Sequence, residues 1–125
     1  MEEQSFDILY VDDEQNNLDG FKASFRRDFK IILANTATDG MKVLNDFPEI
    51  PIIISDQRMP KTTGSEFLEK VSHRFPDSIR ILITGYADLE STIEAINKGK
   101  IFYYISKPIN YDQLLTLIEK YISLD

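Results

Sequence analysis

The segment Ile8-Leu9-Tyr10-Val11-Asp12-Asp13-Glu14 changes abruptly from apolar to acidic residues. The apolar part belongs to the run Phe6–Val11, which has little polar alternation. A short run of this kind is typical of a strand that is buried on both faces of a parallel sheet. The acidic residues would then stand at the carboxyl end of that strand. We therefore predict a parallel sheet with polar side chains along one edge.

Four further short runs extend the same pattern along the chain. They are Lys30–Ala34, Pro51–Ser55, Ile79–Thr84 and Ile101–Ile105. The first of these four is the poorest in apolar residues, so we expect it at an edge of the sheet. The other three, like Phe6–Val11, are expected to be buried on both faces.

Amphipathic stretches separate these runs and predict helices. Their apolar residues recur at helical spacing: Leu18, Phe21, Phe25 and Phe29; Met41, Leu44 and Phe47; Phe67, Leu68 and Val71; Leu89, Ile93 and Ile96; Leu114, Leu117, Ile118 and Tyr121. Candidate caps precede the second, fourth and fifth stretches at Thr36, Asp88 and Asn110, and Gly99 would end the fourth. Five strands alternating with five helices predict right-handed crossovers and a three-layer α/β sandwich. We expect residues 1–125 to form a single domain.

Composition limits the classes of function. The chain has 125 residues, with 21 Asp and Glu against 14 Lys and Arg, so its formal net charge is -7. This balance argues against nucleic acid or an anionic membrane as a direct partner. The absence of cysteine excludes disulfides and thiolate metal sites and suits a cytoplasmic protein. No apolar run approaches the roughly 20 residues that a transmembrane helix needs.

Polar residues at the ends of the predicted strands indicate a functional site. Asp12 and Asp13 follow the first strand, Asp56 the third and Lys107 the fifth, while Thr84 ends the fourth. Ligands of open parallel sheets bind at the carboxyl ends of the strands. One carboxylate after a strand is commonly only a helix cap. That reading is weak for a set of three carboxylates, a hydroxyl and an ammonium.

The chemistry of this set favours a phosphoryl site with a divalent cation. Three neighbouring carboxylates repel one another unless a cation is present. Only oxygen ligands are offered, which suits Mg²⁺ best. Lys107 would add positive charge and Thr84 a hydrogen-bond donor, as the positioning and neutralisation of a phosphoryl group require. Asp56 would be the nucleophile and would form an acyl phosphate.

The motifs of the chain resemble those of the response-regulator receiver domains of bacterial two-component signalling. They are Ile8–Glu14, Ser55–Pro60 with Gly64, Ile83–Gly85 and Tyr104–Pro108, in this order and each at a strand end. The resemblance covers essentially the whole chain. It implies a flavodoxin-like (βα)5 fold whose parallel sheet has the strand order 2-1-3-4-5.

The resemblance also implies roles for individual residues and partners. Asp56 is then the phosphoacceptor, Asp13 a direct Mg²⁺ ligand, Asp12 a ligand through water, Arg58 a ligand through its backbone carbonyl, Thr84 the switch hydroxyl, Lys107 its ion-pairing lysine and Tyr104 the aromatic switch. The expected donor is a sensor histidine kinase or a phosphotransfer protein. The fourth helix, fifth strand and fifth helix would form the surface for an output domain or a homodimer. The motifs at 56–60 and 84–88 resemble receivers attached to HD-GYP phosphodiesterase-type outputs.

Two alternatives remain open on the sequence. A phosphatase of the haloacid-dehalogenase type would use an aspartyl nucleophile with a second acid two residues later, where this chain has Arg58. A receiver fold could also serve as a docking module without phosphorylation, although the five chemical positions are intact. For Tyr104, composition alone favours a core aromatic residue in a strand.

Overall fold

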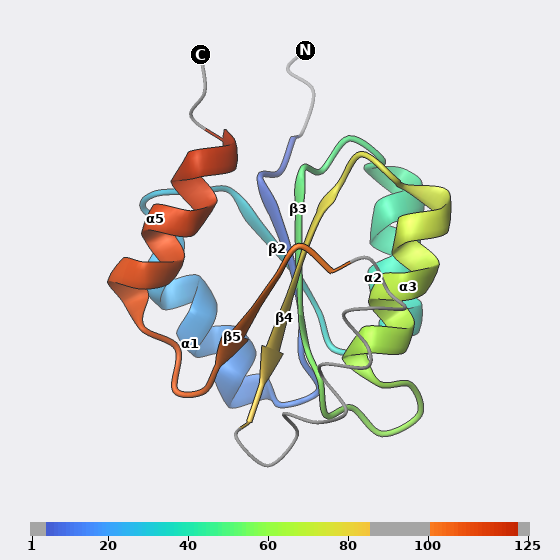
Figure 1. Ribbon diagram of the computed structural model, residues 1–125, viewed down its shortest axis with the longest axis horizontal. Coiled ribbons are helices and arrows are strands. Elements are labelled where there is room, and N and C mark those ends of the chain that lie inside the picture. Colours follow the sequence, from blue (N-terminus) through green and yellow to red (C-terminus); the bar gives the residue numbers. More distant parts are fainter. Residues whose placement is uncertain (1–4, 86–100, 123–125) are drawn as a thin grey trace.

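A computed structural model of the chain describes residues 5–85 and 101–122 (Figure 1). These residues form a five-stranded parallel sheet in the order β2-β1-β3-β4-β5. The strands are β1 (Ile8–Val11), β2 (Ile31–Ala34), β3 (Ile52–Asp56), β4 (Ile79–Thr84) and β5 (Tyr103–Ser106). The order predicted from the resemblance is confirmed, and β2 lies at an edge as its composition predicts.

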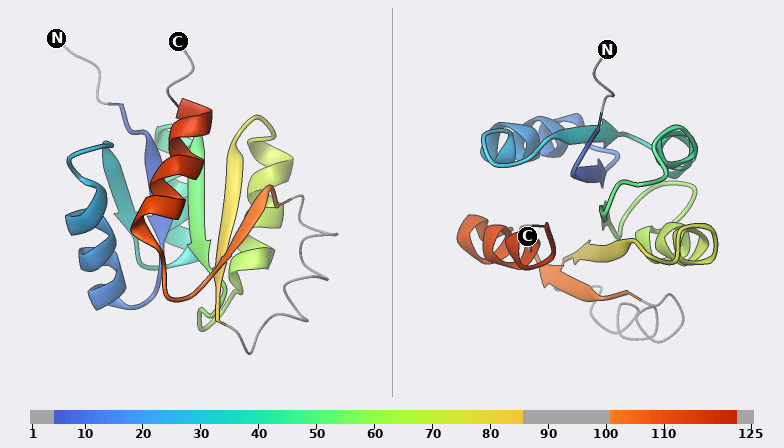
Figure 2. Two further views of the ribbon diagram at one scale, coloured as in Figure 1. Left: turned by 60° about the vertical axis from the view of Figure 1, so that its left-hand side comes forward. Right: turned by 90° about the horizontal axis from the view of Figure 1, so that it is seen from above.

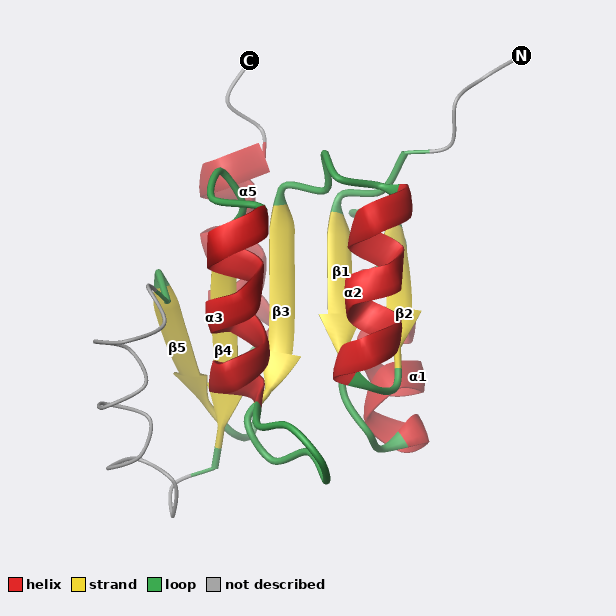
Figure 3. Cartoon of the chain, turned by 90° about the vertical axis from the view of Figure 1, so that its right-hand side faces the viewer, coloured by secondary structure: helices red, strands yellow, loops and turns green. Residues whose placement is uncertain are grey.

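Helices cover both faces of the sheet and make the three predicted layers. The described helices are α1 (Gln15–Phe25), α2 (Ala37–Asp46), α3 (Gly64–Arg74) and α5 (Tyr111–Ile122). Figure 2 shows α1 and α5 on one face and α2 and α3 on the other, and Figure 3 looks onto α2 and α3 from the side. The helix expected between Asp88 and Gly99 lies outside the described residues.

Side-chain caps begin three of these helices. Thr36 Oγ1 accepts a hydrogen bond from the Asp39 backbone N–H at 3.0 Å, and Asn110 Oδ1 accepts one from the Gln113 N–H at 2.9 Å. Thr63 forms a complete capping box at the start of α3. Caps satisfy backbone donors that have no partner within the helix. The caps predicted at Thr36 and Asn110 are therefore confirmed.

The sheet divides the hydrophobic core into two halves, one on each of its faces. Ile8 and Tyr10 pack into the half under α1 and α5, whereas Leu9 and Val11 pack into the half under α2 and α3. Successive side chains of a strand point to opposite faces of a sheet, so β1 serves both halves. All four residues are at most 1% exposed.

The fifth strand differs from its prediction. It begins at Tyr103 rather than Ile101 and extends to Ser106, and Ile105 is its single buried residue. The expectation of burial on both faces is wrong here, because the strand order places β5 at the second edge of the sheet. The apolar run alone does not reveal this edge position, whereas the strand order implied by the family resemblance does.

The register of the sheet brings the strand ends together. Val11 pairs with Ala34 and Ser55, and Thr84 pairs with Ser106. The third strand ends one residue later than predicted, so Asp56 is the last residue of β3 and does not follow the strand. Asp56 pairs with Ile83. Residues that follow these positions therefore share one edge.

Within the described ranges, no helix combines the length and apolar character needed to cross a membrane.

Candidate functional site

Three carboxylates meet at the carboxyl edge of the sheet. Asp12 and Asp13 follow β1 directly and Asp56 ends β3. One oxygen from each carboxylate lies within 4.8 Å of the others. Asp12 is fully buried and Asp56 is 3% exposed, while Asp13 is exposed. The structure thus brings together the acidic residues that the sequence singles out.

The Asp12 carboxylate accepts hydrogen bonds on both of its oxygens. Oδ1 accepts one from the Glu14 backbone N–H at 3.0 Å. Oδ2 accepts one from the Tyr10 hydroxyl at 2.9 Å and one from the Asn17 side-chain amide at 3.1 Å. A buried charge needs such partners, because water no longer solvates it. These donors also fix the orientation of the carboxylate.

Asp56 lies between a backbone donor and an ammonium group. Its Oδ2 accepts a hydrogen bond from the Arg58 N–H at 3.1 Å, and the Lys107 Nζ lies 2.6 Å from its Oδ1. Despite this ion pair, Oδ1 accepts no hydrogen bond of regular geometry from the described part of the chain. Oδ1 is therefore a buried carboxylate oxygen that has the Lys107 ammonium beside it.

The ionisation of Asp56 reflects this mixed environment. Burial of the carboxyl, reinforced by the charge of Asp12, raises the pKa of Asp56, and Lys107 and the Arg58 N–H offset only part of the rise. Burial alone would lower the pKa of Lys107, but the Asp56 carboxylate raises it above the ordinary lysine value. The site therefore has an excess of negative charge that a bound cation would relieve.

A glycine allows the loop after β3 to return close to Asp56. The Gly64 backbone N–H donates to the Gln57 carbonyl at 3.0 Å. A Cβ at Gly64 would lie 2.1 Å from the Asp56 carbonyl oxygen, closer than any side chain permits. The buried Gln57 side chain closes the same loop, since its Oε1 accepts from the Ser65 N–H at 2.8 Å. The loop that follows Asp56 is thus packed against the first turn of α3.

The remaining predicted residues also lie around this edge. Thr84 is 1% exposed at the end of β4, and its hydroxyl donates to the Gly85 carbonyl at 3.2 Å. Arg58 is exposed in the loop after β3. Tyr104 is 44% exposed, so it is not the core aromatic residue that composition favours.

The donor set fits a hard divalent cation. Mg²⁺ binds oxygen ligands, takes one or two carboxylates and fills its remaining positions with water or phosphate oxygens. The three clustered carboxylates, the free lone pair on Asp56 Oδ1 and the excess negative charge meet these requirements. Among the described residues, no other group of acids and histidines of this kind is present.

Sequence reasoning missed two residues of the site. Tyr10 and Asn17 both donate to Asp12, but a tyrosine inside an apolar strand is first interpreted as a core residue. The available signal was the spacing: Tyr10 and Asp12 are two residues apart on a strand, so their side chains lie on the same face. Asn17 lies in the first turn of α1, where no local pattern distinguishes it from a solvated polar residue.

Comparison with known proteins agrees with this arrangement. A family model described as the response regulator receiver domain matches residues 8–119. The hydrogenase transcriptional regulatory protein HoxA of Bradyrhizobium diazoefficiens is 36% identical over 117 residues, which cover 94% of this chain and 24% of HoxA. The regulatory protein AtoC of Escherichia coli is 31% identical over 120 residues, which cover 94% of this chain and 25% of AtoC. The chain thus spans about a quarter of these relatives.

Two solved structures show the same fold over nearly their whole length. A response regulator receiver domain protein from Clostridium thermocellum superposes with a TM-score of 0.86 at 29% identity, covering 93% of each chain. The signal receiver domain of an HD domain-containing protein from Pseudomonas fluorescens superposes with a TM-score of 0.87 at 28% identity, covering 96% of each chain.

Proposed function

Because the chain belongs to the response regulator receiver domain family, we propose that its Asp56 carboxylate accepts a phosphoryl group from a histidine kinase or a phosphotransfer protein. The observation that carries the proposal is the buried Asp56 Oδ1, which has a free lone pair and the Lys107 ammonium 2.6 Å away. The phosphoryl group that this oxygen would receive brings negative charge, which a neighbouring cation such as the Lys107 ammonium must balance.

The transfer exchanges one phosphorus bond for another. An oxygen of Asp56 attacks the phosphorus, the bond between phosphorus and the donor's histidine nitrogen breaks, and that nitrogen keeps the electron pair and takes up a proton. Asp12, Asp13, Asp56 and the Arg58 backbone carbonyl would hold Mg²⁺, which supplies positive charge beside the phosphoryl oxygens. Lys107 would pair with a phosphoryl oxygen, and the Thr84 hydroxyl would donate to another.

The switch would act on the surface that includes β5 and α5. Phe102, Tyr103 and Tyr104 are exposed there, at 49%, 37% and 44%. A shift of Thr84 toward the phosphoryl group would be coupled to Tyr104, and the altered surface would bind an output domain or a second copy. A local change of charge that biases a two-state element is the usual form of such switches. We expect this signalling module to act in the cytoplasm, as one domain, and not to turn over free substrates.

A labelling experiment tests the proposal. With Mg²⁺ present, acetyl phosphate should phosphorylate the wild-type chain on an aspartate, detected as a mass increase that hydroxylamine removes. Asp56→Asn should abolish the modification, because an amide cannot form the acyl phosphate. Asp46→Asn, which changes an exposed aspartate at the end of α2, should be labelled like the wild type.

Two outcomes would contradict the proposal. Aspartyl labelling of Asp56→Asn to the wild-type extent would show that another residue is the acceptor. Sustained multiple-turnover hydrolysis of phosphate esters by the wild type would favour the phosphatase instead.

A further inference from the structure

Tyr10 is a polar residue in an otherwise aliphatic strand. Its side chain is 1% exposed and its ring stacks on Phe21, with centroids 4.1 Å apart and planes at 6°. Its hydroxyl donates to Asp12 Oδ2 at 2.9 Å. The phenol is therefore a buried hydrogen-bond donor whose partner is the Asp12 carboxylate.

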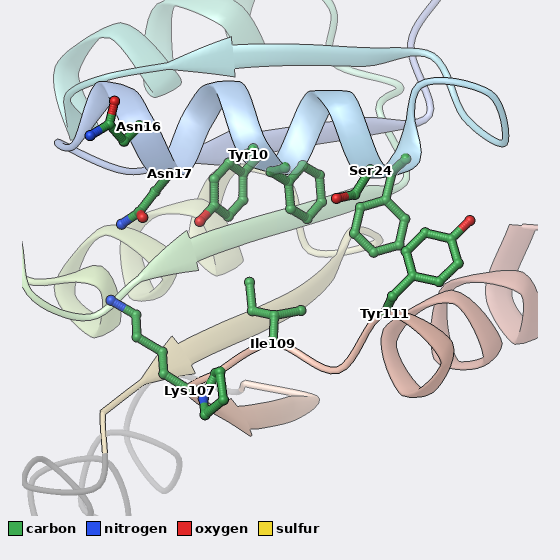
Figure 4. Close-up of a pocket in the computed structure, with 11 residues that line it drawn as sticks. Tyr10, Asn16, Asn17, Ser24, Lys107, Ile109 and Tyr111 are labelled. Carbon is green, nitrogen blue, oxygen red and sulfur yellow. The ribbon is translucent and has the colours of Figure 1, made fainter.

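A row of aromatic rings holds the Tyr10 ring in place. The ring centroids of Phe21 and Phe25 are 4.8 Å apart. Phe25 in turn stacks on Tyr111 of α5, with ring centroids also 4.8 Å apart. These rings line a pocket of about 610 Å³ between α1 and the segment that follows β5. Figure 4 shows Tyr10 and Asn17 with their polar ends toward the part of the pocket where Lys107 lies. The direction of the phenol is thus set by packing that is independent of Asp12.

The hydrogen bonds to Asp12 are shared unequally between its two carboxylate oxygens. An ionised carboxylate offers about four lone-pair positions, two on each oxygen. Tyr10 and Asn17 occupy both positions on Oδ2, whereas Glu14 occupies one on Oδ1. Within the described residues, Oδ1 is therefore the Asp12 oxygen that keeps a free lone pair.

We propose that Tyr10 is a positioning residue of the cation site, which fixes the Asp12 carboxylate through Oδ2 so that Oδ1 faces the divalent cation or its bound water. This inference rests on the proposed function only in that Asp12, Asp13 and Asp56 bind a cation. Groups that orient metal ligands by hydrogen bonds typically change metal affinity about 10–100-fold when they are removed. Tyr10 would act in this way without touching the cation.

Titration calorimetry with Mg²⁺ alone, on the full chain, tests this role. Tyr10→Phe keeps the ring and its stack on Phe21 but removes the donor, and it should weaken Mg²⁺ binding about 10-fold or more. Tyr111→Phe is the matched control, because it removes a phenol that donates to Asp28 at 2.6 Å, away from the carboxylate cluster. Its Mg²⁺ affinity should equal that of the wild type.

A second variant and a spectroscopic signal separate positioning from a structural defect. Asn17→Ala removes the other donor to Oδ2 from a half-buried position outside the core, and it should also weaken Mg²⁺ binding. Mg²⁺ should perturb the tyrosine ultraviolet spectrum of the wild type and of Tyr111→Phe, but not that of Tyr10→Phe.

Each failure has a distinct meaning. Wild-type Mg²⁺ affinity in folded Tyr10→Phe, or in Asn17→Ala if Tyr10→Phe does not fold, overturns the positioning role and leaves the proposed function intact. A wild-type chain that binds no Mg²⁺ overturns both.

Discussion

At the scale of single residues, two glycines show opposite reasons for lacking a side chain. Gly64 lies against the Asp56 carbonyl, where a Cβ would come within 2.1 Å of a backbone atom. Gly20 lies within α1, where a Cβ would meet nothing within 4 Å. The first glycine is required by the close approach of two backbone segments, and the second only lowers the stability of its helix.

Alanine substitutions should therefore change stability in opposite directions. Gly64→Ala should lower the free energy of unfolding by about 1–3 kcal/mol, because the added Cβ would push the start of α3 away from the end of β3. Gly20→Ala should raise it by about 0.5–1 kcal/mol through helix propensity. Urea denaturation measures both values. Equal effects of the two substitutions would contradict the close approach at Gly64.

At the scale of elements, α3 depends on the capping box that begins it. Thr63 Oγ1 accepts a hydrogen bond from the Glu66 N–H at 3.2 Å, and Glu66 Oε1 accepts one from the Thr63 N–H at 3.2 Å. The backbone and side-chain donors of Thr63 lower the pKa of Glu66. The first turn of α3, which this cap begins, packs against the loop that follows Asp56.

The capping box gives the stability of the fold a defined pH dependence. A pKa that is lower in the folded state means that the unfolded chain binds more protons, so the ionised Glu66 stabilises the fold at higher pH. This contribution is full above the ordinary glutamate pKa and is lost as the pH falls through the lowered value. Glu66→Gln, which keeps the acceptor oxygen, should therefore be less stable than the wild type at neutral pH.

Urea denaturation of both proteins at a series of pH values measures this difference. The two proteins should converge in stability below the glutamate range. A difference that is constant with pH would show that the charge of Glu66 does not contribute.

The sequence predicts helices and strands better than it predicts the burial and the hydrogen-bond partners of individual residues. The strands and their order follow from apolar runs and from a family resemblance, because both are carried by neighbouring residues. The exposure of β5 does not follow from its own apolar run, because exposure depends on the neighbouring strands; only the strand order implied by the resemblance places β5 at an edge. The donors to Asp12 were missed for the same reason: Tyr10 and Phe25 are both aromatic core residues by pattern, and only the fold shows which of them reaches a carboxylate.

At the scale of the whole molecule, part of the net charge of -7 is concentrated in one place in the fold. Asp12, Asp13 and Asp56 lie together at one edge, and two of them are buried. This concentration lowers the stability of the fold unless a cation is bound. The acidic composition is therefore partly a property of the site and not only of the solvated surface.

Mg²⁺ should raise the melting temperature of the chain, because it binds the folded state and not the unfolded one. At about 100 times its dissociation constant, a single ligand stabilises by about 2.7 kcal/mol. Asp13→Asn should melt at a higher temperature than the wild type without metal, since one repulsive charge is removed, and should respond less to Mg²⁺.

Calorimetric melting curves with and without Mg²⁺ test both effects. Asp46→Asn, which removes an exposed charge elsewhere, is the control. If neither Mg²⁺ nor Asp13→Asn changes the melting temperature, the three carboxylates do not repel one another as described.

The order of the strands in the sheet determines when, during folding, the site becomes complete. Asp56 and Lys107 meet only when β4 and β5 have joined the sheet beside β3, because they are far apart in the sequence. A chain that is still emerging from the ribosome, or that has lost β5, would have the Asp56 carboxylate without the Lys107 ammonium beside it. Under the proposed function, such an incompletely folded chain would lack part of the site that receives the phosphoryl group, so phosphorylation would be restricted to copies in which the last strand is in place.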